Sequence, residues 1–462
     1  MSVSASDVEL WCRTLETTTS DADRARAAEL ITQFKAMESP FELATEVLHR
    51  GASPSAQYHA LSAIRDASVR ARGLPAFQPD LIARLSEFGC AHVTTMPVYL
   101  STHVAHVVAV LAKCVWATEL ETGAAAGSAA AALQGLVESV AAPSAGPAQR
   151  AFASHLLLAL LSDFNVTSSA SLSLPWHVHV SLHRAFERAL LLPVTVAAVQ
   201  LALAAVPAEG GPAAAAAALA AAGAEAAGAL NRLLTVIERA LEWEFEEAVS
   251  TEALLRRDAL QTVSVAGADG SDSAGGSGGD GGSGREAAAA VCPGAAWAPV
   301  LFGSGLVPSL LRLHAALLLL AAPALGHVLD PSAAPPQCER RLELAATRAA
   351  AELRRVFTQF TCLRGSVLTG DAPGASGSGG GAAGGHSPAT LTMYAACGMD
   401  PPALQLHSSS SSSSGSGGLL SPTALLRSAQ APAFLAEVCV VISTLVARSE
   451  EHTSELQSHS DL

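Results

Sequence analysis

Apolar residues recur every three or four positions through most of this chain, which is the period of an α-helix. In residues 22–37, for example, Ala27, Leu30, Ile31 and Phe34 fall on one helical face. No run shows sustained alternation of apolar and polar residues flanked by hairpin turns. Only 4% of the residues are aromatic, so alanine and leucine carry the apolar content, and both favour helices. The sequence therefore predicts an all-α fold.

Helix starts and ends are marked by capping signals. In the string SPFE, Ser39 can cap a helix, Pro40 suits the first helical position and Glu42 can complete a capping box. Gly51 is then expected to end this helix. The same signals predict further helices from near residues 54, 79, 97, 128 and 147, with ends near Gly73 and Gly89. The residues that these helices are expected to bury include Phe41, Ala44, Val47, Leu48, Tyr58, Leu61, Ile64, Ala67, Leu85, Phe88, Val104 and Phe152.

Pairs of such helices recur about every 40 residues, which is typical of HEAT or armadillo repeats. Each pair has an apolar face that it cannot bury alone, so neighbouring pairs are expected to stack into a solenoid. A compact helical bundle is the alternative, although it does not need so many similar short hairpins. We therefore predict a HEAT/armadillo-like helical-repeat solenoid.

Segments rich in Ala, Gly and Ser interrupt the helical pattern and are expected to be disordered insertions. The last segment abandons the pattern and resembles a translated sequencing adapter, with a genuine polar tail as the alternative. The expected order is HEAT-like repeats in 1–206, an Ala/Gly-rich insertion in 207–229, HEAT-like helices in 230–262, a Gly/Ser linker in 263–290, HEAT-like helices in 291–369, a low-complexity insertion in 370–418, a HEAT-like helix in 419–447 and the probable artefactual tail in 448–462.

The formal net charge of −14 makes binding to nucleic acid or to an anionic membrane unfavourable, and suits a basic protein partner instead. The eight cysteines are far apart and form no CxxC pair, so no zinc site is expected. No signal peptide is expected from the first residues, which together with unpaired thiols favours the cytosol or nucleus. The apolar stretches 189–206 and 310–329 are marginal in length and purity, so we expect buried helices, with membrane spans as the alternative.

No motif in the sequence supports an enzyme or a bound cofactor. Phosphate loops, nucleophile elbows and HExxH zinc motifs do not occur. The spacing of His177, His179 and His183 could suit a metal, but ordinary positions at a helix start and surface are the preferred interpretation. His103 and His106 are expected to be a satisfied, partly buried pair. The acidic segment 238–247 is expected to be a solvated helix face, or else a partner-binding edge.

Four regions resemble nuclear export receptors of the importin-β superfamily, in particular the exportin-4 family. They are SPFELATEVLHR (39–50) with YHALSAIRDASVR (58–70), LLALLSDF (157–164) with WHVHVSLHRAFE (176–187), VIERALEWEF (236–245), and VFTQFTCLRGSVLTGD (356–371) with AFLAEVCVVISTL (433–445). The Ala, Gly and Ser insertions have no family counterpart, and residues 285–345 align poorly. Members of the family have a solenoid more than twice as long, so the resemblance is to an N-terminal fragment.

The resemblance implies that the chain binds the small GTPase Ran in its GTP form, together with protein cargo and nuclear pore proteins, while shuttling between nucleus and cytoplasm. It implies no enzyme activity, no cofactor, no direct nucleic-acid contact and no membrane. The second helix of each pair usually lines the concave side of such an array, so Arg65, Asp66 and Arg70 are the candidate Ran-binding residues. A HEAT-repeat scaffold that has no role in transport is the alternative function.

Overall fold

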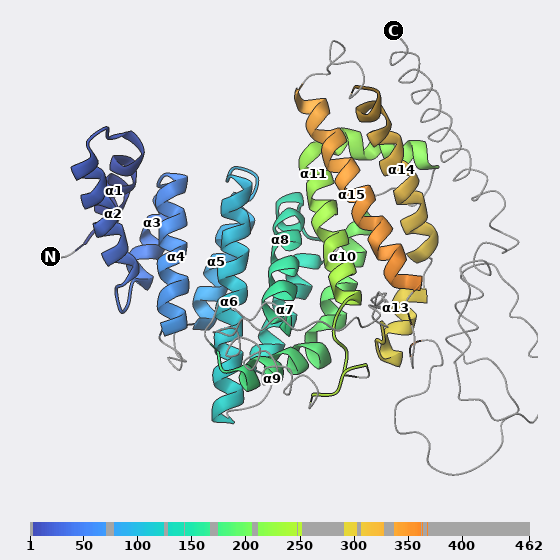
Figure 1. Ribbon diagram of the computed structural model, residues 1–462, viewed down its shortest axis with the longest axis horizontal. Coiled ribbons are helices and arrows are strands. Elements are labelled where there is room, and N and C mark those ends of the chain that lie inside the picture. The colour runs from blue at the N-terminus through green and yellow to red at the C-terminus, as the bar shows by residue number, and fades with distance from the viewer. Residues whose placement is uncertain are drawn as a thin grey trace, which may run out of the picture. The chain divides into compact units, whose positions relative to one another are not determined.

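The computed structural model describes residues 3–70, 78–123, 128–142, 144–166, 174–205, 211–246, 248–251, 291–302, 306–327, 337–361, 363 and 367. These residues are mostly helical and form no strand, which confirms the all-α prediction for them (Figure 1). The chain divides into two units, Met1–Leu201 with Thr251–Ser273, and Ala202–Ser250 with Ala274–Leu462. The predicted linker 263–290, insertion 370–418, helix 419–447 and tail 448–462 lie outside the described residues.

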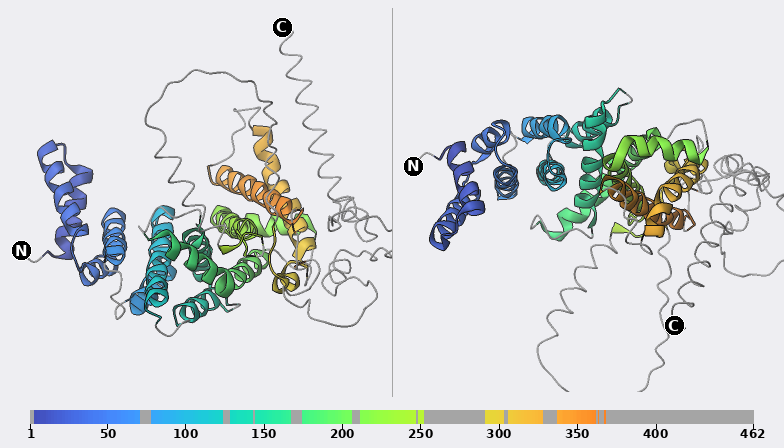
Figure 2. Two further views of the ribbon diagram at one scale, coloured as in Figure 1. Left: turned by 60° about the horizontal axis from the view of Figure 1, so that its bottom comes forward. Right: turned by 90° about the horizontal axis from the view of Figure 1, so that it is seen from above.

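The first unit is a series of helices that follow one another in chain order, as Figures 1 and 2 show. Successive helices are joined by short connections and pack as pairs, α1 with α2, α3 with α4, α5 with α6 and α7 with α8. The second helices of the pairs also pack on one another, α2 on α4, α4 on α6 and α6 on α8. The helices are α1 (Ala5–Thr17), α2 (Asp21–Lys35), α3 (Phe41–His49), α4 (Pro54–Arg70), α5 (Gln78–His92), α6 (Val98–Thr122), α7 (Ser128–Ala141), α8 (Pro147–Phe164) and α9 (Trp176–Phe186), followed by a π-helical turn (Glu187–Leu191) and α10 (Leu192–Ala204), which crosses the division between the units.

Most expected helices of this unit are present, but four local expectations are wrong. Pro40 rather than Ser39 is the N-cap of α3, and no side chain caps this helix. Gly89 does not end α5, which continues to His92. The glycine lies instead against Phe152 of α8, and its lack of a side chain permits that close contact. Tyr58 is 39% exposed and Phe41 is half-buried, although both were expected to be buried; the Tyr58 ring stacks on His103 of α6 while part of it stays open to water.

The second unit consists of α11 (Pro212–Leu241), a 3-10 turn (Ala295–Trp297), α13 (Ala298–Phe302), α14 (Leu306–His327) and α15 (Gln337–Thr361). Helices α11, α14 and α15 all pack on one another. The expectation of a disordered insertion in 207–229 is wrong from residue 212 onward, because alanine is the strongest helix former and the Ala-rich stretch continues into α11. Ala215, Ala216 and Leu219 of this stretch are buried, and Gly223, with φ of +84°, kinks the helix.

Within the described residues, three helical segments are long and apolar enough to cross a membrane, judged by length and composition alone: Val98–Thr122, Trp176–Ala204 and Pro212–Leu241. The apolar stretch 189–206 overlaps the second of these, whereas 310–329 overlaps only a shorter apolar helix, Ser309–Ala321. In α6, 72% of the most apolar window is buried within the protein, so packing against neighbouring helices accounts for its apolar character. The apolar window of α11 is only 28% buried and is made chiefly of alanine.

Cys12, Cys90, Cys114 and Cys292 form no disulfide bond in the part of the chain whose side chains the structure describes. Burial raises the pKa of both Cys12 and Cys90 to about 11. These thiols therefore stay protonated at neutral pH and behave as small apolar residues.

The contact between Gly89 on α5 and Phe152 on α8 gives a test of this packing. A β-carbon on Gly89 would lie 2.2 Å from Phe152 Cε2, and the Phe152 ring is fully buried. We expect Gly89→Ala to lower the free energy of unfolding by about 1–3 kcal/mol, measured by urea denaturation, because the ring has no space into which it can move. Gly135 on α7 has nothing within 4 Å, so Gly135→Ala is the control and should stabilise by up to about 1 kcal/mol. Equal effects of the two substitutions would contradict this packing.

Candidate partner-binding face on helix α4

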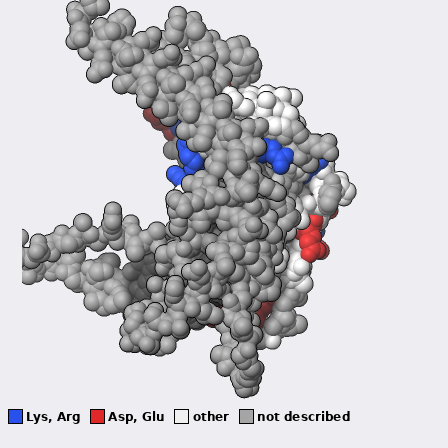
Figure 3. All heavy atoms as spheres, turned by 90° about the vertical axis from the view of Figure 1, so that its right-hand side faces the viewer, with Lys and Arg blue, Asp and Glu red and all other residues white. Residues whose placement is uncertain are grey.

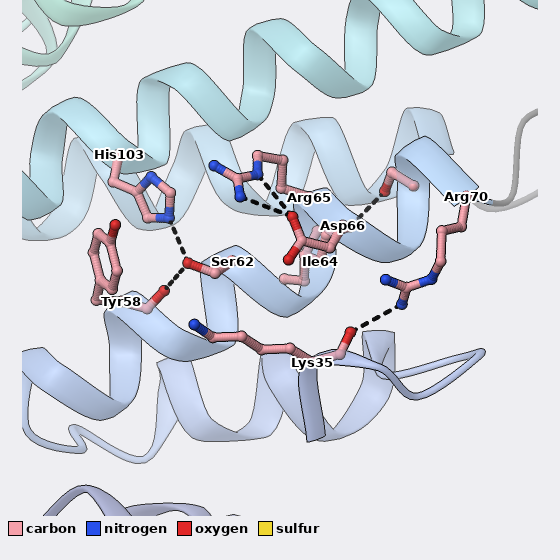
Figure 4. Close-up of polar contacts among 9 residues, drawn as sticks. Lys35, Tyr58, Ser62, Ile64, Arg65, Asp66, Arg70 and His103 are labelled. Atoms are coloured by element: carbon pink, nitrogen blue, oxygen red, sulfur yellow. Dashed lines mark hydrogen bonds and ion pairs between the residues drawn. The ribbon is translucent and has the colours of Figure 1, made fainter. Parts of the chain in front are cut away.

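Helix α4 carries all three candidate Ran-binding residues and is held on several sides by α2, α3 and α6. Its buried side is made of small and branched apolar residues, which allow close approach of the neighbouring helices. These buried residues include Ala56, Ala60, Leu61, Ala63, Ile64 and Ala67. The charged side chains of α4 lie away from this core (Figure 4).

Arg65 and Asp66 form an ion pair with each other on adjacent positions of α4. The Nε and Nη2 atoms of Arg65 donate hydrogen bonds to Asp66 Oδ1 at 2.9 and 2.8 Å. The side chains are 36% and 33% exposed, so water still reaches both groups. A pair this exposed contributes little to stability, which leaves both residues available to a partner.

Arg70 has a different environment from the other two candidates. Its Nη2 donates to the backbone carbonyl of Lys35 at 2.9 Å (Figure 4) and to that of Met37 at 2.9 Å. These carbonyls belong to the C-terminal end of α2, where backbone acceptors have no partner within the helix. Arg70 therefore joins α4 to the end of α2, and the hydrogen bonds of its guanidinium stabilise the contact between these two helices.

Lys35 is a basic residue near Asp66 that the sequence analysis missed. It is the last residue of α2, and its side chain lies beside α4 in Figure 4. Burial lowers the pKa of Lys35, while the negative charge of Asp66 opposes this effect. The contact depends on α2 packing against α4, so spacing along the sequence gave no signal for it. The candidate face thus presents Arg65, Asp66 and the half-buried Lys35.

A layer of polar and aromatic contacts fixes α4 against α6 beneath this face. His103 on α6 stacks on Tyr58 with ring centroids 4.4 Å apart, and its Nε2 lies 3.2 Å from Ser62 Oγ. Burial, with a smaller contribution from Arg65, lowers the pKa of His103 to about 4. His103 is therefore neutral at physiological pH and can share one hydrogen bond with Ser62.

The expectation of a satisfied His103/His106 pair is confirmed. His106 Nδ1 lies 2.8 Å from Asp163 Oδ2 on α8. Close by, the buried Lys113 donates to the backbone carbonyl of Asp163, and its ammonium lies 5.8 Å from the centre of the Phe164 ring. Burial lowers the pKa of Lys113 to about 8. These contacts join α6 to α8.

The three histidines of α9 lie in different environments. His177 is exposed, whereas His179 and His183 are buried, which corrects the expectation of surface positions for these two. The Nδ1 atom of His183 accepts a hydrogen bond from the backbone of Val166 at 3.2 Å. Among the residues that the structure describes, no group of three or more His, Cys, Asp and Glu side chains could hold a metal ion.

The described part of the acidic segment, residues 238–246 of the second unit, is not a simple solvated face. Trp243 and Phe245 are buried, and Phe245 contacts Trp297 edge-to-face at 5.5 Å. Glu238 on α11 is only 7% exposed. Burial, together with the nearby charges of Glu242 and Glu352, raises the pKa of Glu238 to about 7.

On the face drawn in Figure 3, the described basic and acidic side chains are scattered rather than gathered into one patch.

Comparison of the chain with family models, with curated proteins and with solved structures finds no match.

The contrast between Arg70 and Arg65 predicts different effects on stability. Arg70→Met removes two charge-assisted hydrogen bonds to the end of α2, so we expect a loss of about 1 kcal/mol in the free energy of unfolding. Arg65→Met removes only an exposed ion pair and should change stability by less than about 0.5 kcal/mol. Urea denaturation of both variants measures the difference. Equal losses would show that Arg70 has no special role in joining the helices.

The raised pKa of Glu238 predicts a pH-dependent stability of the second unit. The folded protein holds this proton up to about pH 7, whereas the unfolded chain releases it near its ordinary pKa of 4.5. The stabilisation is therefore complete below pH 4.5 and is lost as the pH rises to about 7. Glu238→Gln imitates the protonated carboxyl. We therefore expect the variant to have a higher thermal midpoint than wild type at pH 8, and the same thermal midpoint as wild type at pH 4. Glu121→Gln, at an exposed position of α6, is the control. A constant difference at both pH values would contradict the prediction.

Proposed function

We propose that this chain is part of a nuclear export receptor of the importin-β superfamily, related to the exportin-4 family. In this proposal it binds Ran in its GTP form and takes protein cargo from the nucleus to the cytoplasm, using helix pairs of the HEAT type. Contacts with nuclear pore proteins belong to the same proposal. The chain acts by presenting a surface, with no catalytic step, no cofactor, and no direct contact with nucleic acid or a membrane.

The observation that carries the proposal is the placement of the first resembling region on one packed helix pair. SPFELATEVLHR coincides with α3, and YHALSAIRDASVR coincides with α4, and the two helices contact each other. Within the second string, Ala63, Ile64 and Ala67 are buried, while Arg65 and Asp66 remain reachable by water. One short string therefore supplies both the core contact and the charged face that a partner would meet.

The order of the helices supports the finer fold in this proposal. In the first unit each pair packs on the next through its second helix, from α2 to α4, α6 and α8. Such stacking of neighbouring pairs is what a helical repeat array requires, because a single pair leaves its apolar face uncovered. The net charge of −14 favours encounter with a partner that carries basic patches.

The test is binding of the full chain to Ran loaded with a non-hydrolysable GTP analogue or with GDP, measured by biolayer interferometry. We expect binding to the GTP form to be at least about tenfold tighter, which corresponds to about 1.4 kcal/mol. Circular dichroism of the same sample establishes that the chain is helical. Equal or absent binding by a helical sample would overturn the proposal and favour a scaffold with no role in transport.

Substitutions on α4 test which residues take part. Arg65→Glu with Asp66→Lys exchanges the two charges while keeping the ion pair, so stability should stay within about 0.5 kcal/mol of wild type. Binding to the GTP form should weaken by about tenfold or more, because each partner group then meets the wrong charge. Arg13→Glu with Glu9→Lys exchanges an exposed ion pair on α1 and is the matched control. If both exchanges have the same effect on binding, α4 is not the binding face.

A further inference from the structure

Helix α15 of the second unit packs against α11 and α14 and leaves one face in water (Figure 1). Of its acidic side chains that the structure describes, Glu343 and Glu352 are only 7% and 9% exposed. Its arginines, in contrast, are all exposed: Arg340, Arg341, Arg348, Arg354 and Arg355. With 3.6 residues per turn, these positions fall within about 140° of the helix circumference. Among the described side chains of α15, the exposed face therefore carries positive charge alone.

The sign of this face is opposite to that of the whole chain. Asp and Glu together number 41, against 27 Lys and Arg. A face that only keeps a protein soluble usually mixes both signs of charge. Arg355 Nη1 lies 3.0 Å from Glu352 Oε2, but 65% of the Arg355 side chain is still exposed. The other four arginines form no ion pair with any residue that the structure describes, so their charges are available to a partner.

The exposed residues of α15 repeat every seven positions. Arg341, Arg348 and Arg355 are seven residues apart, which is about 10 Å along the helix and almost two full turns. Leu344, which is 51% exposed, follows Arg341 by three positions and precedes Arg348 by four. The half-buried Ala351 has the same relation to Arg348 and Arg355. An apolar row beside a charged row, both with a period of seven, is typical of a helix that pairs with another helix.

We propose that this face of α15 binds an acidic amphipathic helix of a partner protein. Carboxylates that repeat every seven residues on the partner pair with Arg341, Arg348 and Arg355, and its apolar side chains pack on Leu344. Every basic residue of α15 is arginine, whose planar guanidinium can hold a carboxylate by two hydrogen bonds. The face lies in the second unit and involves none of the candidate residues of α4, so the inference does not depend on the proposed function.

The same arginines could attract a nucleic acid or an anionic membrane, but an acidic helix fits the face better. The net charge of −14 opposes the approach of any large polyanion. Screening limits this field to about 8 Å at physiological salt, so a single helix that lies along α15 meets chiefly the arginines. A nucleic acid makes most of its contacts through phosphate and sugar, which give the exposed Leu344 no apolar partner.

The experiment is fluorescence anisotropy of the full chain with three labelled helical peptides of about three heptads each. The first peptide places Glu and Leu on one helical face, each repeating every seven residues. The second has the same composition with Glu moved to the opposite face, and the third has Lys in place of each Glu. We expect saturable binding of the first peptide, binding of the second weaker by about tenfold, and no measurable binding of the third. Equal affinity for the first two, or no binding of the first, would overturn the proposal.

Variants of exposed residues then locate the site. Arg341→Gln with Arg348→Gln should weaken binding of the first peptide by about tenfold, and Leu344→Ser by about fivefold. The matched control for charge is Arg13→Gln with Arg26→Gln, which removes two arginines of the first unit whose side chains are 65% and 64% exposed. Leu10→Ser, at a position that is 56% exposed, is the control for Leu344. Both controls should stay within about twofold of wild type, and losses equal to those of the α15 variants would overturn the proposal.

The other two classes of occupant are tested with the wild-type chain. A labelled single-stranded RNA is measured in the same anisotropy assay, and vesicles that contain phosphatidylserine are measured by co-sedimentation. At physiological salt we expect the RNA to bind at least about tenfold more weakly than the first peptide, and the chain to stay in the supernatant of the vesicles. Tighter binding of the RNA, or co-sedimentation that Arg341→Gln with Arg348→Gln abolishes, would overturn the proposal.

Discussion

The first unit depends on the burial of α6. This helix packs against α4, α5, α7, α8 and α9, and nearly all of its residues between Leu100 and Ala117 are buried. A helix that is apolar on all sides has no polar face to expose to water, so it is stable only when neighbouring helices cover every side. The pairs before and after α6 in the chain supply these neighbours. The pairs α3–α4, α5–α6 and α7–α8 therefore meet around α6.

Three polar side chains on α6 have partners on the helices that cover it. His103 meets Ser62 on α4, whereas His106 and Lys113 meet the side chain and the backbone carbonyl of Asp163 on α8. A buried polar group without a partner costs free energy, so these contacts favour one relative arrangement of the helices. Burial also keeps His103 neutral, since its pKa falls to about 4. The polar groups thus add specificity to a core whose stability comes from apolar contact.

Helix α4 shows how this core positions surfaces for binding. Its apolar side chains pack on α2, α3 and α6, while Arg65 and Asp66, beside Lys35 of α2, remain reachable by water. These two charges also lie close enough to His103 of α6 to influence its pKa.

The positions of most helices follow from the sequence by itself, because apolar period, proline at helix starts and glycine at turns act over a few neighbouring residues. The starts near 54, 97, 128 and 147 needed no tertiary information. Tertiary contacts alone decided that Arg70 caps α2 while Arg65 stays exposed, that Gly89 continues a helix, and that the Ala-rich stretch after 212 packs as part of α11. Each of these outcomes depends on which helices lie side by side, and residues far apart in sequence determine that.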